Sequence, residues 1–407
     1  MNKTLRGLLV LIGIVVFTAV VCVWLPFAFL PSQGTGMALP VISVPGEVLW
    51  KDFPFEGFDL TNTMVGTLVT SLILLLILLW LRTRSGGIKA VPGRLQSVLE
   101  LVSEYWYNLS KSIAGARAGR VFPLVMTIFM FLLIANWIKL VPGAESVGLL
   151  HCAHPGLNGY PAVQIAEIGQ TPVERLDVTG PLDAGTAATL PDFCACELEH
   201  FGHIPDEYAA ECAEAGFVNP EHADEGEGEA SAEGEGTAHA EGESEGETGA
   251  ATPGGANPNL LVVTPFVRGA TTDLNLTVAL ALFAVVAIQV FGVWAQGPNY
   301  FQKFINLDAL GNLGKKPLGL IDFLVGLLEI VSEFAKIISF AFRLFGNLFA
   351  GSVLLFIISF LLALIVPMVI YGLELFVGLM QAFVFAVLTL VFSAQAMAGH
   401  HGDDEHH

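Results

Sequence analysis

Charged residues are scarce in this chain of 407 residues: they make up only 14% of it, whereas hydrophobic residues make up 54%. The mean hydropathy is +0.66. This balance excludes a soluble enzyme and is typical of an integral membrane protein. The sequence also lacks a basic patch of the kind that binds nucleic acid, so no nucleic acid partner is expected.

Positive charge is almost missing from one long segment. Residues 143–262 contain 23 Asp and Glu against a single basic residue, Arg175. The negative charge of the whole chain, formally −20, is therefore concentrated in this segment. The second half of this segment includes "EGEGEASAEGEGTAHAEGESEGETGA", a low-complexity tract that buries too little apolar area to offset chain entropy. We therefore expect residues 143–262 to form an acidic, partly disordered insertion.

Long hydrophobic runs dominate the remainder of the sequence. Residues 8–30 are consistent with either a signal peptide or an extra N-terminal membrane helix. Residues 318–366 would measure roughly 73 Å as a helix, which exceeds the ~30 Å of bilayer hydrocarbon. Either this run breaks into a hairpin, or it and residues 368–397 are strongly tilted. The other predicted membrane helices lie at residues 60–81, 121–141 and 274–294, and a shorter interfacial helix lies near residues 95–113.

Basic residues border two of these runs and indicate the topology. Arg82, Arg84 and Lys89 follow the run at 60–81, and Lys315 and Lys316 precede the run at 318–366. The positive-inside rule then places residues 143–262 outside and the polar tail "AGHHGDDEHH" inside.

The fold class predicted is all-α integral membrane, with five membrane helices besides residues 1–30. The division expected is: 1–30, signal peptide or extra helix; 31–59, external segment; 60–142, two membrane helices with the interfacial helix; 143–262, insertion; 263–399, ion-translocating core; 400–407, inner tail.

A single charged residue, Arg343, occurs between residues 338 and 366. A guanidinium keeps its proton at any physiological pH, and placing it at mid-bilayer costs at least a few kcal/mol. It therefore requires a counter-charge, a water-filled cavity or a function. Other polar residues share faces of the predicted helices: Glu329, Ser332, Glu333, Lys336 and Asn347 near Arg343; Glu374, Gln381 and Gln395 on the last helix; Asp273, Asn275 and Thr277 on an earlier one.

Two explanations of these polar residues remain open. In one, they are structural pairs, with Arg343 bound to Glu374 to fix helix packing. In the other, they line an ion path, because aligned intramembrane ionisable groups are functional by default. One alternative class of protein is a stand-alone channel or secondary transporter. Another is a structural membrane anchor. A transporter would predict internal repeats with broken helix pairs, and the sequence shows no such symmetry.

The segment "AFRLFGNLFAGSVLLF" resembles subunit a of the F-type ATP synthases, the stator subunit beside the rotating ring of c subunits. "TTDLNLTVALAL", "LMQAFVFAVLTLVFSAQAMAGHH" and the spacing of Glu329 before Arg343 resemble the same family. The resemblance covers residues 58–141 weakly and 264–400 well. Residues 143–262 match nothing in it.

The resemblance implies proton or other ion translocation through two half-channels, coupled to ATP synthesis. Arg343 would meet the ring carboxylate. Asn347, Glu374, Gln381, Asp273 and Asn275 would belong to the outer half-channel, and Glu329 and Ser332 to the inner one. Relatives often carry an ionisable residue where this chain has Ser352, so Ser352 or water would complete the relay with Glu374.

The same resemblance implies the partners and the location. The partners would be the c-subunit ring, b-type peripheral stalk subunits, other ATP synthase subunits and membrane lipid, in a multi-pass arrangement in a cell (inner) membrane. No nucleotide-binding glycine loop or nucleophile triad occurs, so we predict no catalytic residue, no cofactor and no resident metal.

Four cysteines lie in the insertion: Cys152, Cys194, Cys196 and Cys212. We expect disulfides, which persist outside the cell, and four cysteines allow three pairings between which the sequence does not choose. Histidines beside them leave a metal site as an alternative, and free thiols as a third.

Overall fold

The computed structural model describes residues 45–51, 55, 57–84, 93–141, 143–168, 171–178, 184–219, 256–304, 318–361 and 366–398. Three expectations lie outside these residues: the signal peptide or helix at 8–30, the disorder of the Glu/Gly tract, and the polar tail. The described residues fall into two compact units, of which one contains the long helices and the other consists of described residues within 150–263 together with residues 359–361.

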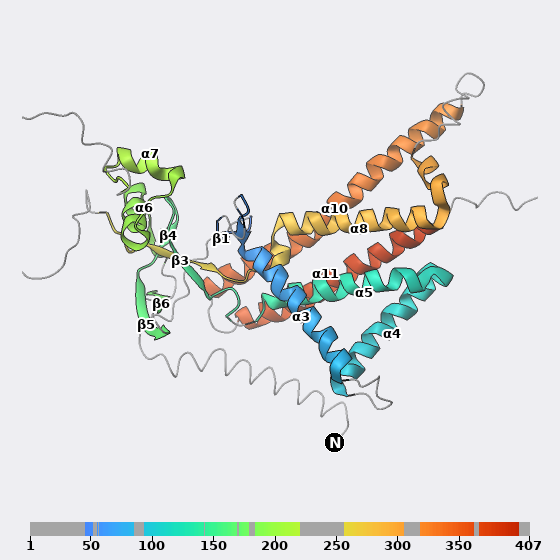
Figure 1. The fold of residues 1–407 in the computed structure, drawn as a ribbon, viewed down its shortest axis with the longest axis horizontal. Helices are drawn as coiled ribbons and strands as arrows, with labels where there is room; N and C mark the ends of the chain where they lie inside the picture. Colours follow the sequence, from blue (N-terminus) through green and yellow to red (C-terminus); the bar gives the residue numbers. More distant parts are fainter. Residues whose placement is uncertain are drawn as a thin grey trace, which may run out of the picture. The chain divides into compact units, whose positions relative to one another are not determined.

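Among the described residues, six long helices make up the unit that we call the first (Figure 1). Their bounds are α3 Asn62–Arg84, α4 Arg94–Ala114, α5 Ala118–Ile138, α8 Leu274–Gln296, α10 Leu318–Leu361 and α11 Val366–Met397. Within the described residues, five helical stretches are long and apolar enough to cross a membrane, with α4 and α5 counted as one. The predicted all-α integral membrane fold is confirmed.

The helix predicted near residues 95–113 is confirmed as α4, and its end has a local cause. Gly115 caps α4 with a positive φ of 56°. Residues other than glycine rarely adopt such a backbone conformation. A short 3-10 turn, η2 Gly115–Arg117, then leads into α5. The apolar run of residues 96–138 is therefore two helices that pack against each other.

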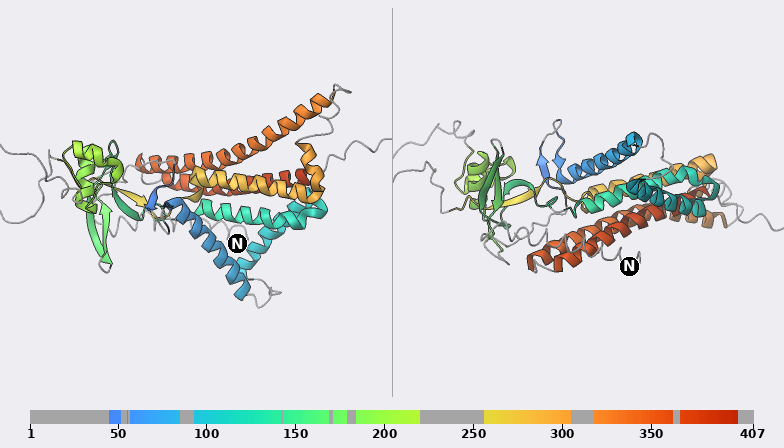
Figure 2. Two further views of the ribbon diagram at one scale, coloured as in Figure 1. Left: turned by 45° about the horizontal axis from the view of Figure 1, so that its top comes forward. Right: turned by 90° about the horizontal axis from the view of Figure 1, so that it is seen from below.

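The hairpin alternative for residues 318–366 is wrong. α10 is one continuous helix of 44 residues, roughly 66 Å long at about 1.5 Å per residue. No proline interrupts it, since the nearest prolines are at positions 317 and 367, and an isolated glycine inside a helix costs only about 1 kcal/mol. The N-terminal part of α10 extends away from α8 and α11 (Figures 1 and 2).

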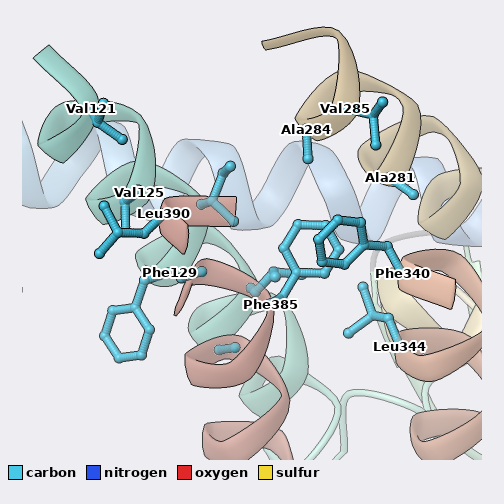
Figure 3. Close-up of a cluster of buried hydrophobic side chains, with 14 of the residues drawn as sticks. Val121, Val125, Phe129, Ala281, Ala284, Val285, Phe340, Leu344, Phe385 and Leu390 are labelled. Atoms are coloured by element: carbon cyan, nitrogen blue, oxygen red, sulfur yellow. The ribbon is translucent and has the colours of Figure 1, made fainter. Parts of the chain in front are cut away.

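An apolar core joins the long helices. α11 packs along α5 and α8, and α4 packs on α5. Figure 3 shows Phe340 of α10 beside Phe385 of α11, whose ring centroids are 4.9 Å apart. α10 contributes one face to this core, because Phe340, Leu344 and Leu348 recur at four-residue intervals and are almost fully buried.

The second unit shows that part of the insertion is folded. β5 Ala162–Ile168 and β6 Thr171–Leu176 form an antiparallel pair, and β3 Gly148–Cys152 pairs with β8 Leu261–Pro265. Other elements of the unit are β4 Asn158–Gly159, which pairs with β7 Thr186–Ala187, and the helices α6 Leu190–Cys196 and α7 Asp206–Glu214.

Two disulfides hold this second unit together. Cys152 is bonded to Cys196, and Cys194 to Cys212. All four cysteines are buried in one small core with Phe193. The disulfide prediction is confirmed, and because every one of these four sulfurs is in a disulfide, none is a thiolate available to a metal.

Candidate functional site

A buried lysine joins three helices near one end of the core. The Nζ of Lys139, one residue beyond α5, lies 2.8 Å from Oε2 of Glu374 on α11. It also donates hydrogen bonds to the hydroxyl of Ser352 at 2.9 Å and to the carbonyl of Leu348 at 3.2 Å, both on α10. The side chains of Lys139 and Glu374 are only 2% and 3% exposed, so this ion pair is shielded from solvent.

A glycine makes room for the carboxylate of this pair. A Cβ added at Gly351 of α10 would overlap Oε1 of Glu374. The carboxylate therefore lies directly against the backbone of α10, and only glycine permits that approach. We call Lys139, Ser352, Gly351 and Glu374 the lysine site.

The hydrogen bonds around the lysine site hold the end of α5 against α11. Asn136 donates to the carbonyl of Gly378 at 2.9 Å and accepts from the hydroxyl of Thr271 at 2.8 Å. Trp137 donates from Nε1 to the carbonyl of Leu375 at 3.1 Å. Because successive residues of α5 all bond outward to neighbouring elements, Lys139 has little freedom to turn away from Glu374.

A second carboxylate lies close to the lysine site, in the loop after α5. Oε1 of Glu145 accepts a hydrogen bond from the backbone N–H of Gly269 at 3.0 Å. The side chain of Lys139 packs against Gly269, since a Cβ added there would lie 3.2 Å from Cδ of the lysine. Burial raises the pKa of Glu145, and the Gly269 bond and the charges of Lys139 and Arg268 offset only part of that rise.

Asp273 and Asn275, expected in the outer half-channel, take part in a helix start. Asp273 is the N-cap of α8: its Oδ1 accepts from the backbone N–H of Asn275 at 2.9 Å. Its Oδ2 accepts from the hydroxyl of Thr63 on α3 at 2.7 Å. Both carboxylate oxygens of Asp273 therefore have structural partners, and the Asn275 residue is exposed.

Arg343 lies on α10 between its buried and exposed faces. Its Nη2 is 3.4 Å from the hydroxyl of Ser339, one turn earlier. In the described part of the chain no carboxylate pairs with Arg343. The suggested Arg343–Glu374 pair is wrong, because Glu374 pairs with Lys139 instead. Asn347, one turn after Arg343, is exposed, and Gln381 on α11 is half-buried.

The opposite end of α10 carries a second polar group of residues. Lys336 pairs with Glu333 at 2.8 Å and lies 5.0 Å from the ring centre of Phe392 on α11. Glu329 and Ser332 are half-buried on the same helix. The rise along a helix puts Glu329 roughly 21 Å from Arg343 on one side, and Ser352 roughly 14 Å from it on the other.

A tyrosine faces this second group. The hydroxyl of Tyr300, in the turn η7 Gly297–Lys303, donates to Oε1 of Gln289 at 2.5 Å. Burial, followed by the nearby charges of Glu333 and Glu329, raises the pKa of Tyr300 to about 12. The tyrosine is therefore neutral at physiological pH, and its one hydroxyl proton is held by Gln289.

The structure thus unites some of the predicted residues and separates others. Ser352 and Glu374 meet through Lys139, Glu329 and Ser332 share one end of α10, and Arg343 lies between the two groups. The role of Lys139 was missed, because a lysine at the end of an apolar run is typical of a membrane interface. Its only signal in the sequence is that it follows Asn136 by three residues, at the end of the apolar run 121–141.

Helices that cross a membrane, with ionisable groups buried among them at two depths, define a multi-pass membrane protein that moves ions. Comparison with known proteins makes this specific. The family model described as "ATP synthase A chain" matches residues 64–168 and 257–394. The chain belongs to the ATP synthase A chain family.

Several curated relatives carry the same description. The ATP synthase subunit a of Mycobacterium ulcerans is 25% identical over 355 residues, covering 85% of this chain and 90% of the relative. That of Mycobacterium bovis is 35% identical over 151 residues, which are 35% of this chain and 53% of the relative. That of Campylobacter jejuni strain RM1221 is 34% identical over 139 residues, 34% of this chain and 57% of the relative.

The family defines the function in outline. The chain translocates protons in the membrane sector of an F-type ATP synthase, and catalysis lies on other subunits, which are its partners. The family model also extends to residue 168, so residues 143–168, which were assigned to an insertion without family counterpart, align with the family.

Proposed function

We propose that protons cross this subunit beside the exposed face of α10, where Arg343 meets the carboxylate of a c subunit in the rotating ring. The single observation that carries the proposal is the position of Arg343: a permanent charge in an apolar helix whose described surroundings supply no carboxylate. A guanidinium in the membrane needs an anion, and a partner subunit can supply it.

The exposed face of α10 has the character of a surface that meets the ring and lipid. Large apolar side chains remain exposed on the helix both before and after Arg343, among them Phe334, Ile338, Phe342, Leu354 and Ile357. An acid on a moving ring crosses lipid only when it is protonated, because an ionised carboxylate is too costly there. A ring carboxylate that reaches Arg343 would release its proton and take up another after passing it.

The two polar groups on α10 provide an outer and an inner half-channel. Asn347, Gln381 and the lysine site with Ser352 and Glu374 form the outer half, with Asp273 and Asn275 at its mouth. Glu329, Ser332 and Tyr300 form the inner half. Arg343 lies between the halves, and its fixed charge would block a direct leak of protons from one to the other.

Sidedness follows from the charges and the disulfides. Arg82 and Arg84 lie in the last turn of α3, which indicates the inner side, and the positive-inside rule places the C-terminus on that side too. The two disulfides of the second unit persist only in an oxidising compartment, which favours the outer side for the folded insertion. Residues 60–142 and 263–399 form the membrane body, in contact with the c ring and with b-type stalk subunits.

The test uses everted membrane vesicles that carry the whole complex. Arg343→Ala should abolish ATP-driven proton pumping while the complex still assembles, and Arg343→Lys should also fail, since the compact, strongly hydrated ammonium does not reproduce the guanidinium fork. Arg82→Ala, which removes an exposed arginine from α3, is the matched control and should pump normally. Pumping by an assembled Arg343→Ala complex would overturn the proposal.

A further inference from the structure

The ion pair between Lys139 and Glu374 is buried in an otherwise apolar helix junction. The core that joins α5, α10 and α11 consists of aliphatic and aromatic side chains. In such surroundings an ion pair is weak evidence for stability, because apolar residues of similar volume stabilise a junction equally well or better. Packing alone therefore does not account for two charges at this position.

The geometry around the pair connects it to both sides of the junction. Toward α10, Glu374 reaches the backbone at Gly351, and Lys139 bonds to Ser352. Away from α10, the lysine side chain packs against Gly269, whose N–H binds the Glu145 carboxylate. The Glu145 residue is partly exposed although its carboxylate is buried, so a row of ionisable groups runs from the loop after α5 to α10.

The charged groups near the pair come from two segments. Glu145 lies in the loop after α5, and Arg268 lies in the segment before α8. On α10, Ser352 and the Leu348 carbonyl contact Lys139, and both are uncharged. Asp273 is turned to Thr63 and to its own helix.

We propose that Lys139 and Glu374 exchange a proton and together form the relay of the outer half-channel. This rests on the proposed function. A proton moves from Nζ of Lys139 to Oε2 of Glu374, which leaves a neutral amine and a carboxylic acid. Glu374 then passes that proton toward the ring carboxylate, and the Lys139 amine takes the next one from the Glu145 side. One proton has crossed, and both residues have regained their charges.

The rival explanation is a static ion pair that only holds α5 and α11 together. The relay and the static pair differ in whether the cation at position 139 must lose its proton. A lysine can lose its proton in a protein interior, whereas an arginine cannot. Lys139→Arg therefore keeps the charge and the ion pair but removes the exchange. The double variant Lys139→Met/Glu374→Gln removes both charges, leaves none unpaired, and also removes the exchange.

The experiment measures ATP-driven proton pumping in everted vesicles with the whole ATP synthase, together with the amount of assembled complex. The relay predicts that both variants assemble and that pumping falls at least about tenfold in each, a lower bound, since a positioned proton-transfer group typically contributes about 10²–10⁴-fold. A static pair predicts near-normal pumping in both. Lys111→Arg, the same exchange at an exposed lysine of α4, is the matched control and should pump normally.

Each outcome decides the matter. Pumping above about one tenth of the wild-type rate in either assembled variant overturns the relay, and so does failure of both to assemble, which would make the pair structural. If Lys139→Arg alone fails to assemble, the double variant decides. Arg343→Ala tests the proposed function separately. An active Lys139→Arg complex together with an inactive Arg343→Ala complex would therefore contradict the relay and leave the proposed function in place.

Discussion

The carboxylate of Glu374 lies against Gly351, so that α11 meets the backbone of α10 at the point where Lys139 arrives from α5. Three segments far apart in the sequence thus share one buried ion pair. The polar path of this subunit depends on a close approach of backbones as well as on its charged residues.

Gly351→Ala should displace Glu374 and impair proton pumping. The added methyl group would overlap Oε1 of the carboxylate, and overpacking of this kind costs about 1–3 kcal/mol. We expect lower pumping in everted vesicles and a lower melting temperature of the purified complex. Gly372→Ala on α11, where an added Cβ meets nothing within 4 Å, is the control. Equal pumping and equal melting temperatures of the two variants would contradict the predicted overlap at Gly351.

Loss of either disulfide should destabilise the folded part of the insertion. The bonds join residues 44 and 18 positions apart, for which the chain-entropy model gives about 4 and about 3 kcal/mol, not additive because the loops overlap. Cys152→Ser/Cys196→Ser should therefore increase protease cleavage of the insertion more than Cys194→Ser/Cys212→Ser. Unchanged cleavage in both double variants would contradict this.

Glu145 should make stability depend on pH. Burial raises the pKa of Glu145 above its ordinary value of 4.5, so the folded state holds the proton more tightly than the unfolded state. The stabilisation is complete below pH 4.5 and is lost as the pH rises through the raised pKa. Glu145→Gln retains an oxygen for the Gly269 bond but does not titrate, so it should be the more stable form at pH 8, and the difference should vanish near pH 4.5.

Melting temperatures of the purified complex between pH 4.5 and pH 8 check this. Glu214→Gln, which neutralises an exposed carboxylate of α7, controls for the loss of one negative charge. A wild-type complex that gains stability relative to Glu145→Gln as the pH rises would contradict the assigned direction.

The sequence predicted what depends on local pattern. Apolar runs of sufficient length gave α3, α5, α8 and α11 nearly to their ends, and the four-residue spacing of Arg343 and Asn347 placed them one turn apart on α10. The partner of Glu374 could not be predicted, because it is set by how α5 and α11 pack. The disulfide pairing and the strands of the insertion depend on tertiary contacts in the same way.

The central claim, that α10 presents Arg343 to a rotor carboxylate, is tested most directly by cysteine cross-linking. Asn347→Cys places a thiol one turn from Arg343 on an exposed position, and a second cysteine is placed beside the ring carboxylate of the c subunit. Oxidation should link the two chains, since a disulfide needs Cα atoms within about 7 Å. If Asn347→Cys forms no such bond while Leu72→Cys on the exposed side of α3 does, the ring lies elsewhere and the account is contradicted.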